Sequence, residues 1–143
     1  MTNYSKEALA RFLDVEVDNL REENYDHYGL TVFSLGDKEY AIGIDEEADE
    51  ACKNYIKDSA WAFNASFILS ECGLPLSGEE SLKEMQTKSY EGANDFILAL
   101  IEKTCGIEEF TKSAISADGR GHFLSGYDGD ENEEGDYFIY RIN

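Results

Sequence analysis

β-Branched and aromatic residues are concentrated in two parts of this chain that lie far apart, and any sheet that forms has to join them. The first part, LTVFSLGDKEYAIGI, contains two strand-like runs around a Gly-Asp pair, which predicts a hairpin with strands at 30–35 and 38–44. The second part, YFIYRI at 137–142, predicts a terminal strand. We therefore expect an α+β fold, in which a small antiparallel sheet of these strands is covered on one face by roughly four to five helices.

Helical periodicity fills most of the chain between these strands. The pattern stays helical from Asp45 to Gly73, and the stretch SAWAFNASFIL after Asp58 is apolar on nearly all sides. This predicts a long central buried helix that can break near Ser59. Shorter helices are predicted at 5–15, 78–90, 92–106 and 107–119.

Two polar segments have weaker patterns. EVDNLREENYDHYG (16–29) predicts a second helical turn or an ordered loop, and HFL (122–124) is a candidate partner for the terminal strand across a long loop. No repeat or linker separates these elements. With 143 residues and 42% hydrophobic content, residues 1–143 are expected to form a single domain.

The cysteines and the amino terminus indicate the compartment. Cys52, Cys72 and Cys105 are odd in number, widely spaced and set in apolar helical contexts, so we expect reduced core thiols. The start MTNYSKEALARFL has neither a basic region nor an apolar core typical of a signal peptide. No window reaches the ~18 apolar residues of a membrane span. A cytosolic protein that does not bind membranes is expected.

The net charge excludes whole classes of partner. There are 31 acidic and 12 basic side chains, which gives a formal charge of −19. This charge repels nucleic acid and anionic membranes and attracts basic proteins. The carboxylates concentrate in three tracts, at 14–26, 45–50 and 128–136. Direct binding to DNA or RNA is therefore not expected.

Two segments carry a resemblance to a known group of proteins. DSAWAFNASFIL (58–69) and AISADGRGHFLSGYDGDENEEGDYFIYRIN (114–143) resemble small acidic proteins that are encoded by bacteriophages and prophages and whose activity is uncharacterised. The resemblance implies a phage gene that acts in the cytoplasm of a bacterial host, by inhibiting host defence or remodelling host machinery. It implies no catalytic residues.

The segment DGRGHF contains the residue types that catalysis most often uses. Asp118, Arg120 and His122 are candidate catalytic residues, because an arginine and a histidine together can bind and protonate a phosphate or carboxylate. No phosphate-binding glycine motif surrounds them. The alternative is a glycine-rich connection in which Arg120 pairs with a nearby carboxylate. His27 is interpreted as a surface histidine with raised proton affinity. Trp61 and Asn64 are interpreted as core or satisfied polar groups, with the lining of a pocket as the alternative.

The acidic tract before the terminal strand resembles half of a calcium-binding loop. Counting Asp130 as the first position places Gly135 at the sixth, but Arg141 falls where a bidentate glutamate is required. We therefore expect no metal and no cofactor, with a weak divalent-cation site at Asp128, Asp130 and Asn132 as an alternative. The favoured interpretation is a solvated turn that keeps the terminal strand from pairing with other chains.

The charge distribution is the strongest indication of function. We expect an acidic protein that binds a basic host protein, for example as a DNA mimic that inhibits a restriction or CRISPR-type protein. The alternatives are an accessory protein that binds another partner and, less favoured, a small enzyme using the DGRGHF segment. The residues expected to contact the partner are Asp45, Glu46, Glu47, Asp49, Glu50, Asp128, Asp130, Glu131, Glu133, Glu134 and Asp136.

Overall fold

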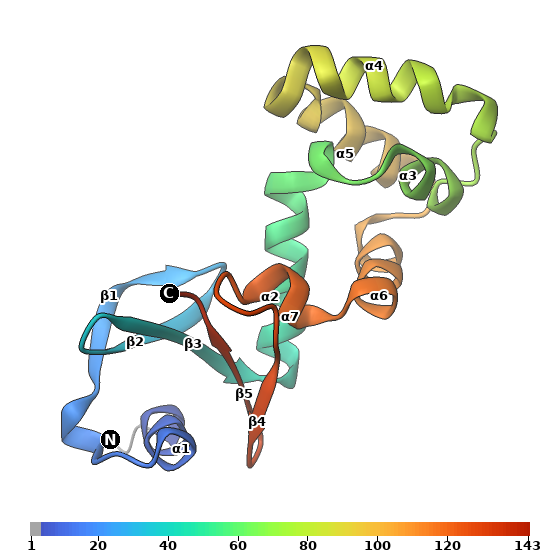
Figure 1. The fold of residues 1–143 in the computed structure, drawn as a ribbon. Coiled ribbons are helices and arrows are strands. Elements are labelled where there is room, and N and C mark those ends of the chain that lie inside the picture. The colour runs from blue at the N-terminus through green and yellow to red at the C-terminus, as the bar shows by residue number, and fades with distance from the viewer. Residues whose placement is uncertain (1–3) are drawn as a thin grey trace. The chain divides into compact units, whose positions relative to one another are not determined.

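The computed structural model describes residues 4–143 (Figure 1). By its internal contacts the chain divides into two compact units. The first comprises the residues up to Asn54 together with Asp118–Asn143, and the second is Tyr55–Ala117. The expected single domain stays a prediction, and each unit is described by itself below.

A five-stranded antiparallel sheet organises the first unit. Its order is β1-β2-β3-β5-β4, with strands at Arg21–His27 (β1), Leu30–Leu35 (β2), Lys38–Ile44 (β3), Asn132–Glu134 (β4) and Tyr137–Arg141 (β5). The predicted hairpin is present as β2 and β3, and the predicted terminal strand pairs with β3 with Ile42 opposite Ile139. The expected α+β class is confirmed.

Two of the strands were not predicted. The segment 16–29 forms a short 3₁₀ turn, Val17–Asn19, and then β1, instead of a helix or loop. Tyr28 and Gly29, both with positive φ, make the two-residue turn into β2, and the Gly29 N–H donates to Asp26 Oδ2 at 2.6 Å. The acidic tract contributes β4, which is the edge strand beside β5.

Helices cover both faces of this sheet, although we expected them on one (Figure 1). Helix α1 (Tyr4–Leu13) packs Leu9 against Phe33, Ile42 and Ile139 on one face. The start of α2 (Asp45–Ser59) and α7 (Arg120–Leu124) lie on the other face. The reason is that β2 and β3 are apolar at both alternating sets of positions, so both faces exclude water. HFL therefore belongs to α7 and is not a strand.

Helices form the second unit. The end of α2 leads into a 3₁₀ turn, Ala60–Ala62, which precedes α3 (Ala65–Glu71). The 3₁₀ turn Leu76–Gly78 precedes α4 (Glu79–Ser89), and another, Tyr90–Ala93, joins α4 to α5 (Asn94–Lys103). Helix α6 (Ile107–Asp118) completes the unit. Its buried side chains include Ile56, Ile68, Ile97, Ile101 and Phe110.

The predicted long helix is interrupted where a break was expected. Helix α2 ends at Ser59, and Asn64 caps α3 by accepting the Ser66 N–H at 2.9 Å. Gly73, at the end of this segment, has a positive φ. The part after Asp58 is not buried all round, because Ala62 and Asn64 are exposed. Within residues 4–143, no helix has the length and apolarity needed to cross a bilayer.

Candidate functional site

Six carboxylates from two distant parts of the sequence lie close together in the first unit. Three come from the first turns of α2 and three from the segment around β4. We call them the acidic cluster: Asp45, Glu46, Asp49, Glu131, Glu133 and Asp136. All six were predicted as partner-binding residues. The second and third acidic tracts of the sequence therefore meet at one surface.

Ile44, the residue immediately before α2, fixes where this helix begins. The N–H of Ile44 donates to Glu47 Oε1 at 2.9 Å, which is the backward half of a capping box. Helix α2 thus begins immediately after β3, with Asp45 and Glu46 in its first turn. Carboxylates there are stabilised by the positive end of the helix dipole.

Arg120 joins the two halves of the cluster. Its Nη1 lies 2.8 Å from Asp45 Oδ1 and 2.9 Å from Asp49 Oδ1. Its Nε lies 2.7 Å from Glu131 Oε2, and its guanidinium carbon stands 4.5 Å from the centre of the Phe138 ring. Only 9% of the Arg120 side chain is exposed, whereas Asp45 and Asp49 keep more than half of theirs. The cation lies beneath the carboxylates.

Burial and these hydrogen bonds act on Arg120 in opposite directions. Burial disfavours the charged guanidinium, but the hydrogen bonds to Glu131 and Asp45 outweigh it, so the pKa of Arg120 is raised above its ordinary value. Below it, Tyr140 donates its hydroxyl to Glu131, and burial together with this bond raises the pKa of Tyr140. Burial also raises the pKa of the Cys52 thiol, to about 12. All three groups keep their protons at neutral pH.

The loop before β4 is held closely against α7. A Cβ atom on Gly121 would lie 2.5 Å from the Gly129 carbonyl oxygen and 2.7 Å from the Asp130 carbonyl carbon, so only glycine fits there. Asp128 accepts hydrogen bonds from the Asp130 N–H at 3.0 Å and from Ser125 Oγ at 2.8 Å, and both lower its pKa. The predicted solvated turn is therefore an ordered one.

A groove of about 410 Å³ lies within the cluster. Asp45 and Glu46 line it from α2, and Glu133 and Asp136 line it from the β4–β5 hairpin. Its apolar part is Ile44 and Phe138, which the sequence analysis did not assign to a site. Phe138 could have been found from the alternation in YFIYRI, since it lies opposite Glu133 in the register.

The other residues of the predicted partner-binding set have separate roles. Glu50 pairs with Lys53 at 3.0 Å, and Glu134 lies 3.5 Å from Arg11 on the other side of the sheet. Glu47 caps α2, Asp128 holds the loop, and Asp130 is exposed. The first acidic tract reaches the opposite edge of the sheet through β1. The cluster is thus a part of the predicted set.

Charge is unevenly shared between the two units. The sequence of the first unit contains 21 acidic and 7 basic residues, and that of the second contains 10 and 5. The first unit, which carries the cluster, therefore has a formal charge of −14 and the second −5. Most of the net charge belongs to the unit with the groove.

The candidate catalytic residues are not brought together. Arg120 is engaged by three carboxylates, which was the alternative interpretation of this segment. Asp118 is exposed at the end of α6, and the exposed His122 ring packs edge-on against Phe123. No hydrogen bond links the three residues in the part of the chain that the structure describes. This arrangement offers no paired acid and base.

The interpretation of His27 was wrong. Its ring is half-buried, and Nε2 donates to the Leu124 carbonyl oxygen at 2.8 Å. Burial lowers the pKa of His27 more than this bond and the charge of Asp26 raise it. The acidic residues beside His27 in the sequence indicated a raised pKa, because the contact of its ring with the end of α7 is not visible in the sequence.

For the alternative cation site, the described residues contain no group of three or more His, Cys, Asp or Glu side chains placed to hold a metal ion.

Neither a scan against protein-family models nor searches of curated proteins and solved structures return a match. The resemblance to small phage proteins therefore stays a prediction.

Proposed function

We propose that this chain is a cytoplasmic binding protein whose acidic cluster contacts a positively charged protein surface. The observation that supports this most is the groove itself, which carboxylates of two separate chain segments line from both sides. Arg120 neutralises part of this charge, but its side chain is covered and does not face a partner. A lysine or arginine could place its ammonium or guanidinium group among the carboxylates and its aliphatic part on Ile44 and Phe138.

We further propose that the partner surface is one that otherwise binds nucleic acid. Asp45 and Glu46 line the groove from one side and Glu133 and Asp136 from the other, as two rows of phosphates flank each groove of duplex DNA. Along the β4 row, Glu131 and Glu133 are two residues apart and hence about 7 Å apart, which is about half the charge density of a DNA strand. On the α2 side, Asp45 lines the groove, and Asp49, one helical turn further along at a spacing of about 6 Å, continues the row beyond it.

The acidic tract 128–136 does not form a single extended row of charges. A fully extended acidic tract would place about one charge every 5 Å on a line, but residues 128–136 fold into a turn, β4 and a second turn. The likeness to DNA is therefore in paired rows and not in one line. A phage-encoded inhibitor of a restriction or CRISPR-type protein is the specific form that the resemblance of residues 58–69 and 114–143 implies.

A pair of charge-matched variants tests the proposal. The cluster variant carries D45N, E46Q, E133Q and D136N, and the control carries the exposed substitutions E80Q, E91Q, D95N and E102Q. Both change the formal charge from −19 to −15. Each protein is immobilised and exposed to a bacterial extract at low salt. The retained proteins are eluted with duplex DNA or with added salt of equal ionic strength.

We expect the unchanged protein and the control variant to retain basic nucleic-acid-binding proteins, and the cluster variant to lose them. Duplex DNA should release them better than the matched salt, because it competes for the same surface. Equal loss in both variants would refute a local site and leave only a general effect of charge. If duplex DNA does not release the retained proteins, mimicry is refuted, but binding to a basic partner is not.

A further inference from the structure

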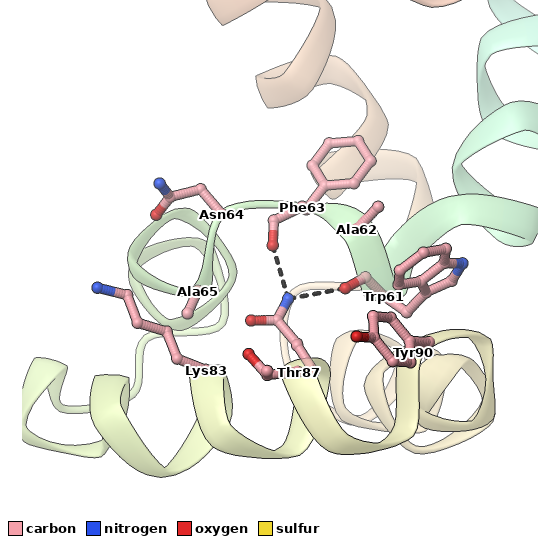
Figure 2. A pocket seen from close by; sticks show the side chains of 9 residues that line it. Trp61, Ala62, Phe63, Asn64, Ala65, Lys83, Thr87 and Tyr90 are labelled. Carbon is pink, nitrogen blue, oxygen red and sulfur yellow. Dashed lines mark hydrogen bonds between the residues drawn. The ribbon is translucent and has the colours of Figure 1, made fainter.

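A second groove, of about 370 Å³, lies entirely within the helical unit (Figure 2). Figure 2 shows the rings of Trp61 and Tyr90 at one end, the Lys83 side chain toward the other, and Thr87 between them. The remaining lining residues are Ala62, Phe63, Asn64, Ala65 and Gln86. The volume is in the range of small-molecule sites.

One face of α4 builds the floor of this groove. Lys83, Gln86 and Thr87 follow the spacing i, i+3 and i+4, which places them on one side of the helix, and Tyr90 follows at its C-cap. Gln86 Nε2 donates to the carbonyl oxygens of Trp61 at 2.8 Å and Phe63 at 2.7 Å. These two bonds hold the segment after α2 in place, so the groove is formed before any ligand arrives.

The backbone of Tyr90 has a conformation that is energetically unfavourable for a residue with a side chain. Its φ of 49° and ψ of −125° lie in a region that glycine adopts readily and other residues adopt at a cost. Tyr90 is 62% exposed, so burial of its side chain does not offset this cost. This conformation places the Tyr90 ring beside Trp61, with the two ring centroids 6.4 Å apart in an edge-on arrangement.

One end of this groove carries a charged side chain that is paired with a carboxylate outside the lining. Lys83 is its one charged lining residue, and no carboxylate lines it. The Lys83 ammonium is 3.1 Å from Glu79 Oε1. The Lys83 side chain is 50% exposed and that of Glu79 is 33% exposed. An ammonium has three N–H donors, so donors remain after this pair. The cationic end therefore suits an anion.

We propose that this groove binds a small aromatic carboxylate, with its ring against the Trp61–Tyr90 pair and its carboxylate at Lys83. The length of the ligand follows from α4. Residues 83 and 90 are seven positions apart, which is about 10 Å along a helix axis. A phenyl ring joined to a carboxylate by a short alkyl chain has this length. Neutral or purely aliphatic compounds fill only one end.

The sequence supplies the reporter for the test, since Trp61 is the only tryptophan in the chain. Its fluorescence is titrated with 4-phenylbutyrate, with the neutral 4-phenylbutyramide and with hexanoate, which lacks the ring. For an open groove and a ligand of this size we expect a dissociation constant of about 1 mM for 4-phenylbutyrate. The other two probes should bind at least about fivefold more weakly.

The variants separate the two ends of the groove. K83M should weaken 4-phenylbutyrate about fivefold and leave the amide unchanged, whereas K88M, an exposed lysine on the same helix paired with Glu84, should change neither. Y90G should abolish binding with an unchanged far-ultraviolet circular dichroism spectrum. The proposal is overturned if 4-phenylbutyrate gives no saturable change, if the amide binds equally well, or if K83M and K88M behave alike.

Discussion

Replacing Arg120 by methionine should destabilise the protein far more than replacing any exposed arginine. Methionine keeps much of the aliphatic chain but removes the guanidinium group over the Phe138 ring together with its three ion pairs, whose N–O distances are 2.7 to 2.9 Å. Asp45 and Asp49 are more than half exposed, so each of these pairs is worth about 0.5 kcal/mol. Glu131 is 30% exposed, and the loss of its partner costs about 2 kcal/mol. We expect a total loss of about 3 kcal/mol.

Arg11 is the matched control. It pairs with Glu134 of the same hairpin at 3.5 Å and is 58% exposed, so R11M should cost less than about 0.5 kcal/mol. Urea unfolding at pH 7, followed by far-ultraviolet circular dichroism, measures both free energies of unfolding. On heating, a loss of about 3 kcal/mol corresponds to a melting temperature about 10 °C lower for a chain of this length.

Salt supplies a second signature of the same variant. Without Arg120, the carboxylates of the cluster repel one another, and salt screens repulsion between exposed charges. Part of the R120M loss should therefore be recovered at high salt, while R11M should change little. An R120M variant no less stable than R11M would show that Arg120 does not hold the cluster together, and the account of the site would fail.

Three further predictions concern other parts of the chain. If residues 1–143 are one cooperative domain, R120M should lower the urea midpoint reported by Trp61 fluorescence, although Trp61 belongs to the other unit; an unchanged midpoint would show independent units. Because the pKa of His27 is lowered from 6.5, protons bind the unfolded chain first as pH falls through about 6.5, so stability decreases there; H27Q should flatten this slope in urea titrations. G121A should cost about 2 kcal/mol and G92A, an ordinary contact, less than about 0.5.

The parts of the fold with long apolar patterns could be predicted from the sequence, and the parts made by pairing could not. The β2–β3 hairpin and β5 carry β-branched and aromatic runs, whereas β1 is exposed along most of its length and shows no alternation. Strand β4 has three polar residues and is recognisable only from its position beside β5. Local patterns do not contain that information.

The candidate sites divide in the same way. The acidic residues were visible in the sequence, but which of them meet depends on Arg120, which reaches across 75 positions to Asp45. Trp61 was interpreted as a core or satisfied polar group, with a pocket as the less favoured alternative, and its place at a groove results from Gln86, 25 positions away. Contacts at such separations follow from packing, and no short motif announces them.

The hold that Arg120 keeps on Asp45, Asp49 and Glu131 has a consequence for recognition. Side chains that are already restrained lose little rotational freedom when a partner arrives, so association is less opposed by entropy than it would be on a surface of mobile glutamates. The partner proposed for this surface would therefore meet a rigid template. Shape, as well as charge, would then decide which cationic proteins fit it.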